Sequence, residues 1–79
     1  MNDNELLTSD LLKDLIRVNA VIATELIQLV ENSSRMVRGG EVPETCKVQH
    51  QKLKREVIEI AERWSDSCQT LREHNLAHE

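Results

Sequence analysis

The chain's only strong helix breakers, two glycines and one proline, all lie within five positions near its middle. Gly39, Gly40 and Pro43 leave one long uninterrupted segment before them and another after them. Glycine and proline are the strongest local signals for turns, and the two flanking segments contain neither. Phe and Tyr are absent and Trp64 is the only aromatic residue, so any core must come mainly from aliphatic side chains. We therefore expect an all-α fold with two long helices and one short loop.

Capping chemistry sets the expected limits of the two helices. Thr8 suits an N-cap, and Gly39 can adopt the left-handed conformation that ends a helix. Pro43 suits the first position of the second helix. These signals predict helices over 8–38 and 43–75, a loop over 39–42, and flexible ends over 1–7 and 76–79. Because so short a connection joins antiparallel neighbours, we expect residues 8–75 to form a helical hairpin.

The apolar faces of the two helices differ in width when residues are placed about 100° apart on a helical wheel. The first helix carries apolar residues over about half of its circumference: Leu11, Leu12, Leu15, Ile16, Val18, Ile22, Ala23, Leu26, Ile27, Leu29, Val30, Met36 and Val37. The second confines them to about 100°: Cys46, Leu53, Val57, Ile60, Ala61, Trp64, Cys68 and Leu71. Because a narrow seam covers only part of a broad face, the first helix is expected to need a further partner.

A second copy of the chain is the simplest partner for this surplus surface. A twofold contact uses the same patch on both chains, and two hairpins then form a four-helix bundle. We therefore expect a non-catalytic adaptor or complex subunit that forms a homodimer. The expected interface residues are Leu11, Leu15, Val18, Asn19, Ile22, Leu26, Leu29, Met36 and Trp64. The alternative is an obligate heteromeric subunit, or a chaperone-like partner, that folds only with another chain.

Two of these residues have more than one interpretation. Asn19 lies near the middle of the broad apolar arc, where a polar residue can select register and partner, as in a coiled-coil core. It can equally lie at a wet edge or bond a backbone carbonyl. Trp64 is centred on the narrow seam, and it either anchors a partner interface or belongs to the chain's own core. Val21, Val48 and Ile58 lie off both faces and are expected to be ordinary exposed residues.

The charge is distributed unevenly along the chain. Residues 35–55 hold six basic and two acidic residues, a local charge of +4, so the remaining residues sum to −8 within the total of −4. The basic residues are Arg35, Arg38, Lys47, Lys52, Lys54 and Arg55. In a hairpin they gather at the loop tip, where they could attract an acidic partner or nucleic acid. The acidic total and the lack of aromatic residues for base stacking disfavour nucleic acid, which remains the alternative of another class.

The sequence offers no catalytic or metal-binding pattern. Cys46 and His50 are four residues apart, which suits two metal ligands, but a third and fourth ligand with suitable spacing are lacking. No catalytic triad and no glycine-rich phosphate loop can be assembled, so we expect neither enzyme activity nor a cofactor. Two cysteines, no signal-peptide pattern and no apolar run of about 20 residues favour a cytoplasmic or nuclear protein without a membrane partner.

Overall fold

A computed structural model describes residues 3–77, and this part of the chain is helical without strands. The structure contains three helices: α1 (Asp3–Val37), α2 (Glu44–Trp64) and α3 (Gln69–Ala77). They form a slender rod with principal extents of 56 × 17 × 17 Å. The all-α prediction is confirmed. The expected flexibility of residues 1–2 and 78–79 concerns positions outside the described residues, whereas residues 76–77, also expected to be flexible, belong to α3.

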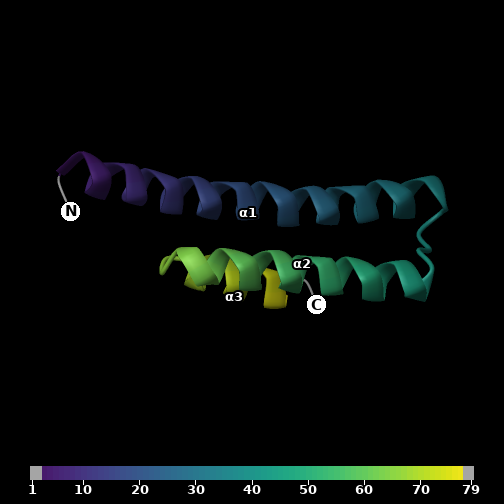
Figure 1. Ribbon diagram of the computed structural model, residues 1–79. Helices are drawn as coiled ribbons and strands as arrows, with labels where there is room; N and C mark the ends of the chain where they lie inside the picture. Colours follow the sequence, from purple (N-terminus) through teal and green to yellow (C-terminus); the bar gives the residue numbers. More distant parts are fainter. Residues whose placement is uncertain (1–2, 78–79) are drawn as a thin grey trace.

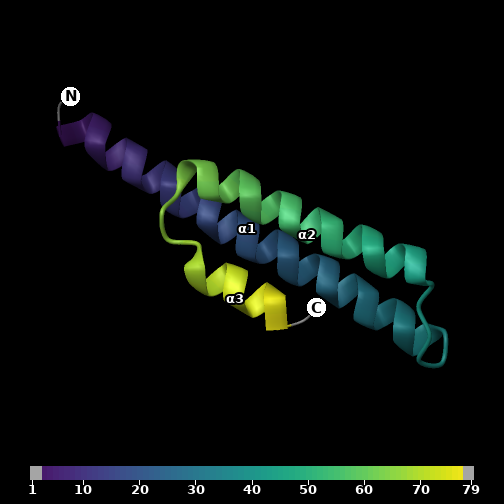
Figure 2. The ribbon, with the colours of Figure 1, turned by 90° about the horizontal axis from the view of Figure 1, so that it is seen from below.

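The helices α1 and α2 lie side by side and run in opposite directions (Figure 1). The chain then reverses after α2, so that α3 returns beside the other two helices (Figure 2). In both views the N-terminal part of α1 extends beyond the end of α2. The three helices therefore surround a single contact region along the middle of α1.

The turn after α1 is built on two glycines with positive φ, Gly39 at 72° and Gly40 at 102°. The Gly40 amide donates to the Arg35 carbonyl at 2.7 Å, and the Gly39 amide donates to the Met36 carbonyl at 3.4 Å. This pair of bonds is the Schellman pattern, which satisfies the last carbonyls of a helix. The prediction that Gly39 ends the first helix is confirmed. Pro43 is the N-cap of α2, one position before its expected place.

The second predicted helix, 43–75, is wrong because it is broken between Trp64 and Gln69. Ser65 has extended backbone angles, φ −139° and ψ 132°, and its amide donates to the Ala61 carbonyl at 2.9 Å. Serine and aspartate compete with helical hydrogen bonds through their side chains, so the segment 65–67, Ser-Asp-Ser, is a weak helical stretch. Folding back at this point buries Cys68 and Leu71 against the hairpin.

The first helix also begins earlier than predicted, at Asp3, so residues 3–7 are helical and Thr8 is not an N-cap. The Thr8 hydroxyl instead donates to the Asn4 carbonyl at 2.8 Å, one turn back along the same helix.

The core of the rod is small. It consists of Ala20, Ile58, Ala61, Cys68 and Leu71, with Ile16 and Val57 packed against it. Two alanines at the centre allow α1 and α2 to approach closely. The three helices thus bury a narrow line of mostly small residues, and the large aliphatic side chains of α1 take little part.

Candidate interaction surface

Six large aliphatic side chains form a row along α1, which we call the α1 stripe: Leu11, Leu15, Val18, Ile22, Leu26 and Leu29. Their exposed fractions range from 49% at Val18 to 66% at Leu11. On a helical wheel the stripe lies nearly opposite Ala20, Thr24 and Glu31, the buried residues of α1. The hairpin therefore forms on one side of α1 and leaves the stripe uncovered.

One side of the hairpin is an apolar groove between α1 and α2, which we call the open groove. Its lining residues are Ile16, Asn19, Ala20, Ala23, Val57, Ile60 and Ala61. On the same side of α2, Ile60 is flanked by Leu53 and Trp64, and the exposed fractions of Leu53, Ile60 and Trp64 are 48%, 51% and 61%. The α1 stripe, the open groove and these three side chains together make up what we call the open face.

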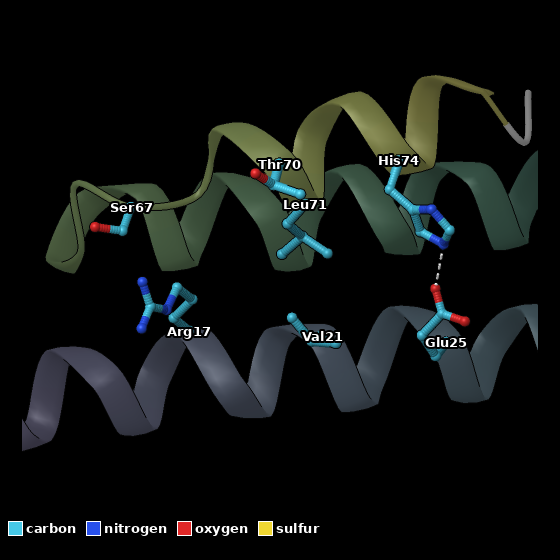
Figure 3. A pocket seen from close by; sticks show the side chains of 7 residues that line it. All are labelled: Arg17, Val21, Glu25, Ser67, Thr70, Leu71 and His74. Atoms are coloured by element: carbon cyan, nitrogen blue, oxygen red, sulfur yellow. Dashed lines mark hydrogen bonds and ion pairs between the residues drawn. The ribbon is translucent and has the colours of Figure 1, made fainter.

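The other side of the hairpin is covered by α3. There Arg17, Val21 and Glu25 of α1 meet Ser67, Thr70, Leu71 and His74 (Figure 3). Nε2 of His74 lies 2.6 Å from Oε1 of Glu25. The Leu71 side chain points toward Val21 in the same view. Because α3 occupies this side, the open face is the side on which a further chain can pack.

Polar side chains hold α1 and α2 together toward the loop. Lys54 is 4% exposed, and its ammonium donates to Oε1 of Gln28 at 3.0 Å. The Gln28 amide donates in turn to Oδ1 of Asn32 at 3.0 Å and to Oε2 of Glu31 at 3.5 Å. Nδ1 of His50 lies 3.3 Å from Oε1 of Glu31. These contacts satisfy the buried polar groups and determine that the side of α2 with Lys54 faces α1.

This arrangement corrects the predicted basic tip, because Lys54 lies between the helices and is not part of it. Arg35 lies 3.9 Å from Glu31, and Lys47 lies 3.9 Å from Glu44. Arg38, Lys52 and Arg55 are exposed. On a helical wheel the basic side chains of α2 spread over more than 150°. They therefore do not form one continuous basic patch.

Asn19 is exposed at the edge of the open groove, and its side chain makes no hydrogen bond within residues 3–77. In the single chain, Asn19 is thus exposed to water at the border of the open groove. Met36, at the end of α1, is 82% exposed.

Trp64 is not part of the chain's own core, so that interpretation is wrong. The buried residues of α2 are Lys54, Ile58 and Ala61, and Trp64 lies to one side of them. Ile58 was expected to be exposed, but it is 3% exposed and central to the core. Val21 and Val48 are exposed as expected, at 41% and 55%.

Residues 3–77 contain neither a metal-binding cluster nor a membrane-spanning helix. No group of three or more His, Cys, Asp or Glu side chains in this range could hold a metal ion. His50 contacts Glu31, and Cys46 and Cys68 are free cysteines. None of the helices in this range is both long enough and apolar enough to cross a membrane.

One ion pair on the surface shifts the pKa of both of its side chains. The Arg72 guanidinium forms hydrogen bonds with the Glu62 carboxylate, one of them at 3.0 Å from Nε. This hydrogen bonding lowers the pKa of Glu62 and raises the pKa of Arg72. The pair joins α3 to α2 on the exposed side of the rod, so its role is to hold α3 in place.

The chain matches no protein-family model, no curated protein and no solved structure. The open face is therefore the feature of the chain from which a function can be inferred. Four exposed residues that lie on the open face, or beside it on a helical wheel, were omitted from the predicted interface: Leu12, Val30, Leu53 and Ile60. Leu12 and Val30 belonged to the broad apolar arc, so the sequence contained their signal. Leu53 and Ile60 were assigned to the contact between the two helices.

Proposed function

We propose that this chain is a non-catalytic protein–protein interaction module, an adaptor or complex subunit, that self-associates through the open face. The observation that carries the proposal is the exposure of the α1 stripe, whose six side chains are each 49% to 66% exposed. Burying a half-exposed leucine or isoleucine contributes about 1 kcal/mol. Contiguous apolar patches of this kind mark sites of association. The proposal places the protein in the cytoplasm or nucleus.

The size of the rod supports a stable homodimer. One long side measures 56 by 17 Å, which leaves room for the accessible surface of about 800 Å² that a stable interface buries on each partner. The two α1 helices then pack against each other through their stripes, with one α2 helix beside each of them, which gives a four-helix bundle. The α3 helices then lie on the outer sides of the bundle, because they cover the opposite side of each hairpin.

The solution mass of the purified chain tests this proposal. We expect light scattering to give twice the mass of one chain at micromolar concentration. A well-folded monomer contradicts self-association. A chain that is unfolded alone and becomes helical only with another protein supports the obligate heteromer. Salt-sensitive binding of duplex nucleic acid that is lost in Lys52→Gln together with Arg55→Gln supports the alternative of another class.

A matched pair of variants assigns the contact to the open face. Leu26 on the α1 stripe and Val48 on α2 are both 55% exposed, but Val48 lies outside the open face. We expect Leu26→Glu to give a monomeric mass, since it places a charge within the apolar interface. Val48→Glu should remain dimeric. Equal effects of the two substitutions would show that association uses another surface.

A further inference from the structure

We infer that the second copy docks antiparallel, with α1 against α1 and the twofold axis level with Ile22. This inference rests on the proposed function and specifies how the open face is used. The distribution of charge along the rod favours this orientation, and both the spacing of the exposed row on α1 and the length of α1 beyond the end of α2 fit it.

The exposed row of α1 has a spacing that is symmetric about Ile22. Extended in both directions, the α1 stripe runs through Leu7, Leu11, Leu15, Val18, Ile22, Leu26, Leu29, Ser33 and Val37. The steps between these residues are 4, 4, 3, 4, 4, 3, 4 and 4, which read the same from either end. Such an 11-residue repeat keeps the row nearly straight along the helix. A reversed copy therefore places Leu15 opposite Leu29 of the second copy, and Ile22 opposite Ile22.

The contacts within the hairpin show that α2 has an exposed apolar residue at the same level. Lys54 contacts Gln28, and His50 contacts Glu31. A residue of α1 and the residue of α2 that lies beside it therefore have numbers that add up to 81 or 82. By this relation Ile22 is level with Ile60, which borders the open groove and is 51% exposed. Ile60 therefore lies at the same level along the rod as the twofold axis that passes between the two copies of Ile22.

The charge distribution favours the antiparallel copy over one with both loop tips at the same end. Residues 3–14 hold four acidic residues and one lysine, a net charge of −3, whereas the loop end, residues 35–55, carries +4. An antiparallel partner brings each acidic end beside a basic loop end about 10 Å away, a distance comparable to the screening length of about 8 Å in physiological salt. Two copies with their loop tips together would place like charges side by side at both ends.

The length of α1 also fits this arrangement. Its N-terminal part extends beyond α2 and carries exposed leucines, with Leu7 67% and Leu12 53% exposed (Figures 1 and 2). Val37 at the other end is 87% exposed. In the antiparallel arrangement Leu7 lies opposite Val37 of the second copy, so each end of α1 covers the other.

Disulfide cross-linking tests the arrangement in the full chain. Ile22→Cys should form a covalent dimer on mild oxidation, because a disulfide needs Cβ atoms about 3.5–4.5 Å apart. Leu15→Cys alone should not, since the two copies of residue 15 are then about 21 Å apart along the axis at about 1.5 Å per residue. An equimolar mixture of Leu15→Cys and Leu29→Cys should give the mixed disulfide, identified by mass spectrometry. The unsubstituted chain, with Cys46 and Cys68, measures the background.

The outcomes separate this inference from the proposed function. A dimeric mass with a covalent dimer from Leu15→Cys alone, or with none from Ile22→Cys, overturns the antiparallel arrangement and leaves self-association standing. A monomeric mass overturns both.

A second test removes negative charge from the N-terminal end of α1 and measures whether dimerisation becomes weaker or stronger. Asp3→Asn together with Asp10→Asn should weaken the antiparallel dimer by about two- to fivefold, since exposed charge pairs contribute little each. The same double substitution should strengthen a dimer whose acidic ends lie together, and that result would overturn the inference. Glu56→Gln together with Glu59→Gln removes equal charge from the middle of the rod and should not weaken dimerisation.

Discussion

At the scale of single residues, the contact between α1 and α2 depends on a buried lysine. Lys54 is 4% exposed and donates to Gln28 at 3.0 Å. A buried charge is tolerated only where hydrogen bonds satisfy it, and it contributes little net stability over an apolar pair. Its effect here is to determine which side of α2 faces α1. The more apolar side, with Leu53 and Trp64, is thereby left on the open face.

Two substitutions in this contact should differ in their effect on the free energy of unfolding. Gln28→Leu removes the acceptor for the buried ammonium of Lys54 and should lower the free energy of unfolding by about 1–3 kcal/mol. Lys54→Met keeps an unbranched chain and removes the charge, so the free energy of unfolding should change by less than about 1 kcal/mol. Urea unfolding of both variants measures this difference. A larger loss in Lys54→Met than in Gln28→Leu would contradict the role assigned to the contact.

At the scale of elements, the end of α1 was predictable and the end of α2 was not. Gly39 ends α1 because glycine adopts positive φ without steric cost, and this is visible in a sequence. The apolar spacing of α2 continues through Cys68 and Leu71, so it predicts one helix. The spacing of apolar residues is the same whether one continuous helix buries them or whether the chain reverses direction and two shorter helices bury them. The weak stretch at Ser65 was the local signal for the break.

The attachment of α3 should depend on pH through Glu62. The hydrogen bond from Arg72 lowers the pKa of Glu62 below its ordinary 4.5. A carboxyl with a lowered pKa in the folded state stabilises that state above its ordinary pKa, and this stabilisation is lost as the pH falls through the lowered value. We therefore expect α3 to loosen first in acid, below about pH 4.5, with falling amide-exchange protection at Leu71 and Asn75. Glu62→Gln should show less protection at neutral pH and a weaker acid response; an unchanged response would assign the effect to other groups.

At the scale of the whole molecule, the surplus of apolar surface could be predicted, but not the side on which it remains. The width of the apolar arc on α1 follows from the spacing of its residues, and Leu15, Ile22 and Leu26 are indeed more than half exposed. The position of α2 on α1 follows from small and polar residues, Ala20 and Gln28 among them. A prediction based on hydrophobicity alone would not select such residues as the contact between the helices. The open face therefore became recognisable only once the positions of α2 and α3 were known.

Association through the open face should make thermal stability depend on protein concentration. Because a dimer that unfolds to two chains gains stability by mass action, each tenfold rise in concentration should raise the Tm by about 3–6 °C for a chain of this size. Circular dichroism melts at about 10 and 100 μM measure this shift. Leu26→Glu should lower the Tm and remove its concentration dependence, whereas Val48→Glu should keep it. A Tm that is the same at both concentrations in the unsubstituted chain would show that the three helices are stable alone, with the α1 stripe in water.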